Sequence, residues 1–143
     1  MKTITSANAI LILTVEDLYP SGVQIEKFAS DDAFSSDNVT IAEVRMGVDG
    51  QLAAGYTPAP IPFKISLEAD SDSIEYLRNI ANNQRLNKTT YSITASISIP
   101  ALDKEFTLIK GILTEVPSIL NAKKVLEPTQ WGFTFEDVND STI

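Results

Sequence analysis

The residues best suited to chemistry in this sequence are carboxylates, and a dense group lies at positions 70–73. The alternation of Asp70 and Asp72 with serines begins like a calcium-binding loop, which needs Gly at its sixth position and a bidentate Glu at its twelfth. Those two positions hold Glu75 and Ala81, so the pattern does not predict a calcium site. Asp72 followed three residues later by Glu75 is instead typical of a helix N-cap with a capping box.

Two further carboxylate pairs, Asp31 with Asp32 and Asp137 with Asp140, have no partner acid or base in view, and we interpret them as solvated. The chain contains no histidine and no cysteine, which removes the commonest general base, the commonest metal ligand and every thiolate. Its six glycines form no phosphate-binding motif. We therefore predict a protein that is not an enzyme, with no catalytic residues, no metal site and no cofactor.

The composition is that of an acidic protein of ordinary domain size. With 143 residues and 43% hydrophobic residues, we expect a single domain over positions 1–143. The net charge of −8 repels nucleic acid and anionic lipid, so conventional DNA binding is not expected. The longest apolar run, residues 9–13, is far shorter than the roughly 20 residues of a membrane helix, and we expect the protein to stay in the cytoplasm.

Alternating apolar and polar residues predict a mainly β fold that must position any functional surface. The predicted strands cover residues 10–15, 23–28, 39–46, 63–69, 91–99, 106–116 and 131–135. Apolar residues at helical spacing predict one amphipathic helix over residues 73–86, packed on the sheet. Strands joined by short turns favour an antiparallel β-sandwich or barrel. We also expect a turn at 19–22 and a frayed polar tail at 137–143.

Residues 47–62 have a composition unlike that of a central strand. The Asp49-Gly50 pair is a strong hairpin signal, and Pro58, Pro60 and Pro62 cannot donate hydrogen bonds to a ladder. We expect this segment to project from the body as a hairpin arm. Apolar side chains exposed on such an arm usually mark a surface for a partner.

The order of elements between Arg45 and Ile80 resembles that of the tail tube proteins of contractile-tailed bacteriophages. A strand runs into a protruding hairpin with a Gly-x-Asp-Gly element, and a returning strand leads to a helix preceded by Ser and Asp residues. The resemblance implies a β-barrel or sandwich related to type VI secretion tube proteins. It further implies hexameric rings that stack into a hollow tube, through which DNA passes during genome ejection.

The resemblance also implies partners and a location. These are further copies of the chain, sheath, baseplate and tail terminator proteins, and the virion tail, assembled in the host cytoplasm. The arm would contact the neighbouring ring, and the stacking residues would be Gly47, Asp49, Gly50, Leu52, Gly55, Tyr56, Pro58, Pro60 and Ile61. The lumen lining would be Ser92, Thr94, Ser96 and Ser98, an uncharged face that would not hold phosphates as Lys or Arg would. The same four side chains could instead face outer solvent.

Other readings stay open at the level of sequence. One is a monomeric β-sandwich module that binds carbohydrate or protein, although a monomer has little reason to keep an extended arm. Another is a small enzyme, which the missing histidine and cysteine disfavour. The aromatic series Trp131, Phe133 and Phe135 could stack nucleic acid bases, but its period of two beside an acidic tail favours a place in the core.

Overall fold

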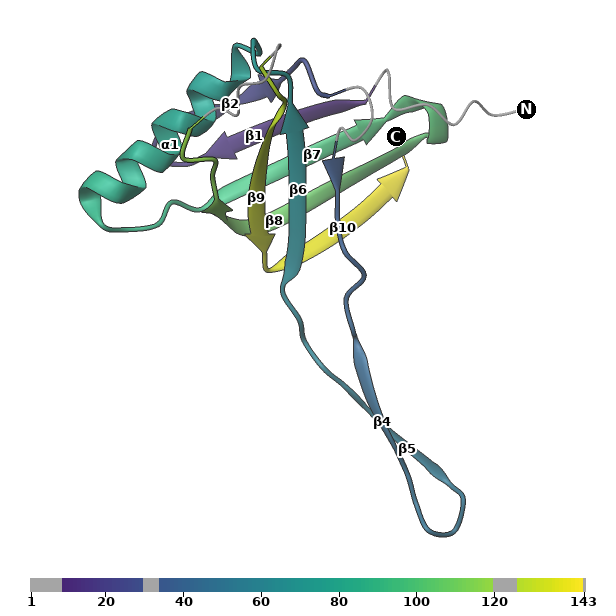
Figure 1. The fold of residues 1–143 in the computed structure, drawn as a ribbon. Helices are drawn as coiled ribbons and strands as arrows, with labels where there is room; N and C mark the ends of the chain where they lie inside the picture. Colours follow the sequence, from purple (N-terminus) through teal and green to yellow (C-terminus); the bar gives the residue numbers. More distant parts are fainter. Residues whose placement is uncertain (1–8, 30–33, 120–125, 143) are drawn as a thin grey trace.

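Two antiparallel sheets and one α-helix form the body, and a two-stranded hairpin projects from it (Figure 1). The computed structural model describes residues 9–29, 34–119 and 126–142. The strands are β1 (Ile10–Val15), β2 (Tyr19–Ile25), β3 (Phe34–Ser35), β4 (Ala42–Met46), β5 (Leu52–Tyr56), β6 (Ile61–Leu67), β7 (Ile93–Ile99), β8 (Lys104–Glu115), β9 (Thr129–Phe135) and β10 (Asp137–Thr142). The helices are α1 (Ser73–Asn87) and a short 3-10 helix at Pro100–Leu102. The predicted class, mainly antiparallel β with one packed helix, is confirmed.

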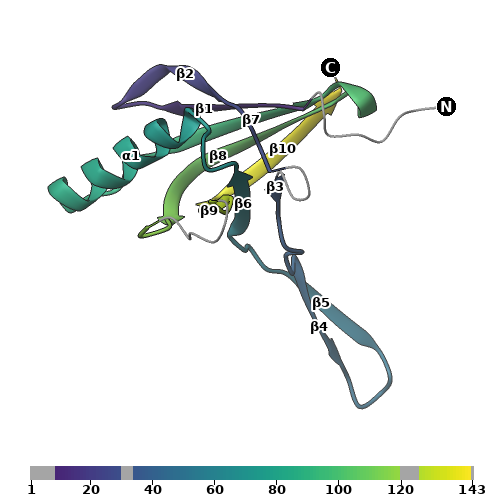
Figure 2. The ribbon, with the colours of Figure 1, turned by 45° about the horizontal axis from the view of Figure 1, so that its top comes forward.

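The long strand β8 belongs to both sheets. Its first half pairs with β7 on one side and β10 on the other, in a sheet of order β2-β1-β7-β8-β10. Its last residues pair with β9, which begins a second sheet of order β8-β9-β6-β3. Strands β6 and β9 run across the first sheet (Figure 1, Figure 2). Among the described strands the path from β2 to β3 does not close, so the fold is an open sandwich rather than a closed barrel.

The chain changes sheets at a bend in β8 around Lys110 and Gly111. Lys110 has a left-handed φ of 52°, and the pairing with β7 shifts register beside it. A bulge of this kind bends a strand and increases its twist. A Cβ on Gly111 would lie 2.2 Å from the ring of Phe135, so glycine leaves the space into which that ring packs.

The inner faces of the two sheets form one hydrophobic core. Trp131, Phe133 and Phe135 are buried in it, as predicted, and the rings of Phe133 and Phe135 stack 6.0 Å apart. The indole Nε1 of Trp131 donates a hydrogen bond to Thr129 Oγ1 at 3.0 Å, which satisfies its one polar group. The guanidinium of Arg78 lies 5.2 Å from the centre of the same ring. These contacts leave the aromatic series unavailable for stacking on a nucleic acid base.

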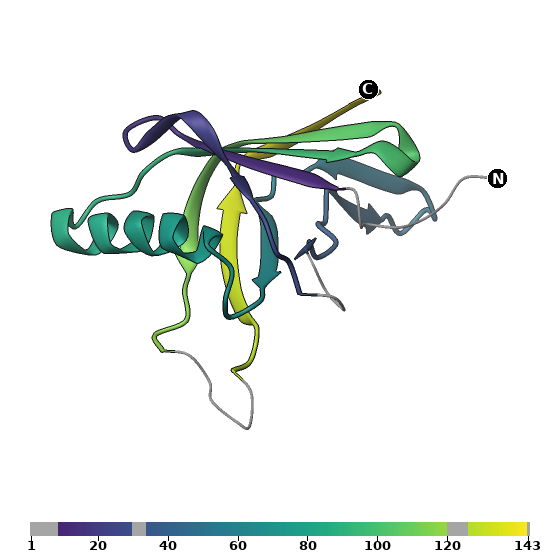
Figure 3. The same cartoon turned by 90° about the horizontal axis from the view of Figure 1, so that it is seen from above.

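Helix α1 lies along one side of the body, away from the arm (Figure 3). Leu77 and Ile80 are fully buried, as their spacing predicted. The predicted capping box is wrong, because Asp72 makes no side-chain cap hydrogen bond. The buried hydroxyl of Ser71 accepts a hydrogen bond from Ser73 N at 3.3 Å, and two serine hydroxyls tie the helix start to the end of β2. Ser71 Oγ donates to Glu26 O at 2.6 Å, and Glu26 N donates to Ser73 Oγ at 2.8 Å.

Three predicted segments differ from the structure. The predicted turn at 19–22 is the start of β2, and its Gly22 has a positive φ of 84° within the strand. The predicted frayed tail is β10, which pairs with β8 from Asp137↔Ile109 to Thr142↔Lys104. The strand predicted at 39–46 is not in the body, since its ordered part is β4 of the arm. In each case backbone pairing, which does not depend on apolar side chains, overrides the local pattern.

Candidate functional site

The candidate site is the projecting hairpin, called the arm here and defined as residues 41–57. Its turn follows directly from the Asp-Gly signal. Gly50 N donates to Gly47 O at 3.0 Å, and Gly47 N donates to Gln51 O at 2.8 Å. Gly50 takes a positive φ of 80°, and Asp49 Oδ1 accepts from Gln51 N at 3.1 Å. This is a tight turn followed by a left-handed glycine, a common hairpin connection, and it confirms the predicted hairpin.

The two strands of the arm pair from Ala42↔Tyr56 to Met46↔Leu52, and Thr57 N donates to Ile41 O at 2.9 Å beyond them. Side chains of directly paired residues share a face, so the pairing sorts the arm into two faces. One face, the apolar arm face, consists of Ala42, Val44, Met46, Leu52, Ala54 and Tyr56. The other carries Glu43, Arg45, Ala53 and Gly55.

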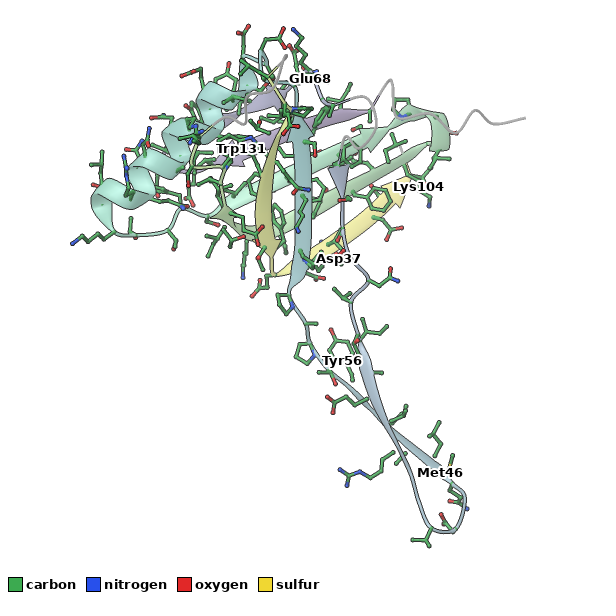
Figure 4. The ribbon with its side chains drawn as sticks, viewed as in Figure 1. Asp37, Met46, Tyr56, Glu68, Lys104 and Trp131 are labelled. Carbon is green, nitrogen blue, oxygen red and sulfur yellow. The ribbon has the colours of Figure 1, made fainter. Side chains whose placement is uncertain are left out.

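No part of the described chain covers the apolar arm face. Met46 is 62% exposed, Leu52 61% and Tyr56 81%, and Figure 4 shows Met46 far from the body near the tip of the arm and Tyr56 closer to its root. Val48 at the tip is fully exposed. Sequence reasoning missed Val44 and Met46, because it assigned them to a body strand. The Asp49-Gly50 turn could have placed them, because the residues that precede such a turn pair with the residues that follow it.

The root of the arm lies closer to the body than predicted. Pro58 and Pro60 form an unpaired extended linker, but Pro62 is in β6 and pairs with Thr134. Ile61 is also in β6, pairs with Phe135 and packs against the core. Of the nine predicted stacking residues, the arm and its linker therefore hold eight, and Ile61 belongs to the body.

The four predicted lumen residues lie together on the outer face of the first sheet. Ile93, Ala95 and Ile97 of β7 point into the core, so Ser92, Thr94, Ser96 and Ser98 point outward. Across the sheet, paired residues form a row of largely uncharged side chains, Gln24, Ile12, Ser96, Thr107 and Asn139. Ser96 Oγ donates to Glu105 Oε1 at 2.9 Å, next to this row.

The remaining carboxylates in the described part of the chain do not come together as a reactive group. Among the described residues, no three potential ligands gather as a metal site. Asp70 pairs with Lys27, and this hydrogen bond lowers the pKa of Asp70 below its ordinary value. Asp137 and Asp140 lie on β10, while Asp31 and Asp32 fall outside the described residues. In the same part of the chain, no helix has the length and apolar character needed to cross a membrane.

Comparison with known families gives one match over almost the whole chain. Residues 2–139 match the family model described as tail fiber protein gp32. No curated protein sequence matches the chain.

Solved structures with a similar fold come from contractile injection systems. A chain of the tube-terminating cap of the anti-feeding prophage is 13% identical, with a TM-score of 0.60 over 100% of this chain and 93% of that one. A chain of the anti-feeding prophage baseplate is 12% identical, with a TM-score of 0.59 over 99% and 97%. A chain of the sheath–tube complex of the extracellular injection system PVC is 15% identical, with a TM-score of 0.55 over 93% and 88%. At such identities the likeness establishes a shared fold, and it covers the body and the arm together.

Proposed function

Because this chain belongs to the tail fiber protein gp32 family and has the fold of contractile-system tail chains, we propose that it is the subunit of a contractile phage tail tube. The chain is a structural component of a phage-like tail. The solved chains that share its fold belong to tail structures and not to enzymes. The proposal concerns what the subunit builds, namely rings that stack into a tube.

The observation that carries the proposal is the arm. A paired hairpin with an uncovered apolar face is unusual on a subunit that works alone, because a two-stranded hairpin is marginally stable in water. Packing the arm on a neighbouring subunit removes that face from water. If every copy offers the same arm to the next, the contact is head to tail and generates a filament.

The outer face of the first sheet supports a lumen role for the residues proposed from sequence. Six subunits per ring would place Ser92, Thr94, Ser96 and Ser98 around a channel. Their hydroxyl groups wet the wall without the positive charge that would bind phosphates and release counterions at every ring. The net charge of −8 also repels the phosphates of DNA, so DNA would pass without specific binding.

The proposed partners follow from a place within the tail. The tube would contact sheath, baseplate and terminator proteins, and it would assemble in the host cytoplasm before becoming part of the virion. Among the similar folds are chains from a baseplate, a sheath–tube complex and a tube-terminating cap, which supports assembly with such components.

The alternative of a monomeric binding module for carbohydrate or protein makes a different prediction for the arm. A module that works alone would tolerate loss of the arm, and its activity would lie on the body. The family description, tail fiber protein, leaves room for this reading. Removal of the arm therefore discriminates between the two functions.

The test is electron microscopy of concentrated protein together with a variant that lacks the hairpin. Residues 42–56 are replaced by Asn-Gly, because Ile41 and Thr57 are already hydrogen-bonded partners that a two-residue turn can join. We expect tubes of stacked six-membered rings from the parent chain, and a folded subunit without tubes from the variant. Tubes of normal length from the variant would show that the arm does not mediate stacking.

A further inference from the structure

An apolar hollow opens between the two sheets on the side where the arm is attached. It has a volume of about 310 Å³, and its walls include Phe34, Ile61, Ile99, Phe106 and Val138. Phe106 and Ile99 lie next to the core without being fully covered, while Val138 is 37% exposed at the rim. As far as the described residues go, the hollow is therefore a place where the core of the sandwich is open to water.

A second hollow, of about 330 Å³, continues the first along the root of the arm. Ile61 and Val138 line both hollows, and the second is completed by Ile41, Tyr56 and the linker with Pro58. Together they form one elongated and largely apolar trough, which runs from the open edge of the sandwich to the base of the arm and has Glu136 and Asp137 in the wall of its second part. Such a shape suits an extended segment with one apolar face better than a small compact ligand.

The chain's own arm cannot fill the trough. The root of the arm is itself part of the wall, and the hairpin runs away from the body from that point (Figure 1, Figure 2). Five paired residues span about 17 Å in an antiparallel ladder, so the tip lies far from the rim. Among the described residues no other segment fills the trough either, so it is open to an occupant from another molecule.

We propose that the occupant is the arm of a second copy of this chain, with its apolar face against the trough. This inference rests on the proposed stacking of subunits and names the surface that receives the arm. Within the described residues each copy carries one uncovered apolar arm face and one uncovered, largely apolar trough, so a single contact, repeated head to tail, covers both. Glu43 and Arg45 lie on the opposite face of the hairpin, so docking need not bury either charge.

The absence of native cysteine makes the contact directly testable by cross-linking. One variant carries Val48→Cys at the arm tip, a second carries Val138→Cys at the trough, and a third carries Leu86→Cys as control. Leu86 is 75% exposed on α1, on the other side of the body from the arm. The tip variant is mixed with either of the others, assembled and treated with a short bis-maleimide. We expect roughly tenfold more dimer with Val138→Cys than with Leu86→Cys, because docking raises the effective concentration.

The outcomes separate this inference from the proposed function. Tubes with equal cross-linking at the two positions would overturn docking in the trough and leave stacking intact. Failure of the cysteine-free parent to form tubes would overturn the proposed function itself and the inference with it. As a second measurement, Val138→Asp should raise the protein concentration needed for tubes at least about tenfold, because it places a charge in the contact. Leu86→Asp should leave that concentration unchanged, and an equal rise in both variants would count against the trough.

Discussion

The residues that matter most in this protein are apolar side chains, and their effect depends on which of them the fold covers. Leu77 and Leu86 both lie on α1, yet the first is fully buried and the second is 75% exposed. The same residue type thus stabilises the body at one position and faces solvent at the other. Charged residues contribute less, since both ion pairs found in the described part of the chain lie at the surface.

Leu77→Ala should lower the free energy of unfolding by about 2–5 kcal/mol, because it leaves a cavity beneath the helix. Leu86→Ala is the matched control and should change it by less than about 0.5 kcal/mol. The single tryptophan, Trp131, is buried in the core, so its fluorescence during urea unfolding measures both values. Equal destabilisation by the two changes would show that the helix does not pack as described.

The ion pair of Asp70 with Lys27 predicts a pH dependence. The hydrogen bond from Lys27 lowers the pKa of Asp70 below its ordinary 3.8 in the folded protein. The pair therefore stabilises the fold above that pH, and its contribution is lost as pH falls through the lowered pKa. Asp70→Asn should melt slightly below the parent protein at pH 7 and level with it in strong acid, with more salt reducing the difference. A difference that grows on acidification would contradict this account.

At the scale of elements, the architecture depends on β8, because this one strand belongs to two sheets. The bend around Lys110 and Gly111 lets its first half pair with β10 and its last residues with β9. The ring of Phe135, the last residue of β9, fills the space beside Gly111. The packing of the two sheets therefore requires a residue without a side chain at position 111.

Gly111→Ala should destabilise the protein by about 1–3 kcal/mol or more, because the new Cβ overlaps the ring of Phe135 and the core must shift. Gly55→Ala in the arm is the control, since a Cβ there meets nothing within 4 Å. Thermal unfolding followed by circular dichroism compares the two. A loss of stability for Gly55→Ala as large as that for Gly111→Ala would argue against this packing.

At the scale of the whole molecule, the proposed stacking requires an acidic body to associate with copies of itself. With a net charge of −8, subunits repel one another, while the surfaces proposed to meet are apolar. Electrostatic repulsion, which acts over a long range, then opposes association, and the burial of apolar surface at the contact favours it. The balance between them depends on salt.

We expect the protein concentration needed for tube formation to fall severalfold between about 0.01 M and 0.1 M salt, where the screening length shortens from about 30 Å to about 10 Å. Sedimentation of assembled protein at increasing concentration measures this threshold. A threshold that rises with salt would indicate that ion pairs, rather than apolar contacts, hold the subunits together.

The sequence by itself determined the local elements of this protein. The alternation in β7 and β9, the spacing of Leu77 and Ile80 and the Asp49-Gly50 turn each act within a few residues, and the structure has them as predicted. The resemblance at the arm was equally readable, because it too depends on a short run of turn residues. The absence of histidine and cysteine excluded the usual catalytic groups without any structure.

Only the tertiary structure decided which strands meet. A period of two identifies the faces of a strand but not its partner, because the ladder is made by backbone groups that every residue carries. For this reason β4 was predicted in the body, and the polar strand β10 was predicted as a frayed tail. The apolar trough likewise gathers Phe34, Ile61, Phe106 and Val138 from separate parts of the chain. Their proximity depends on the sharing of β8 between two sheets, which no local pattern encodes.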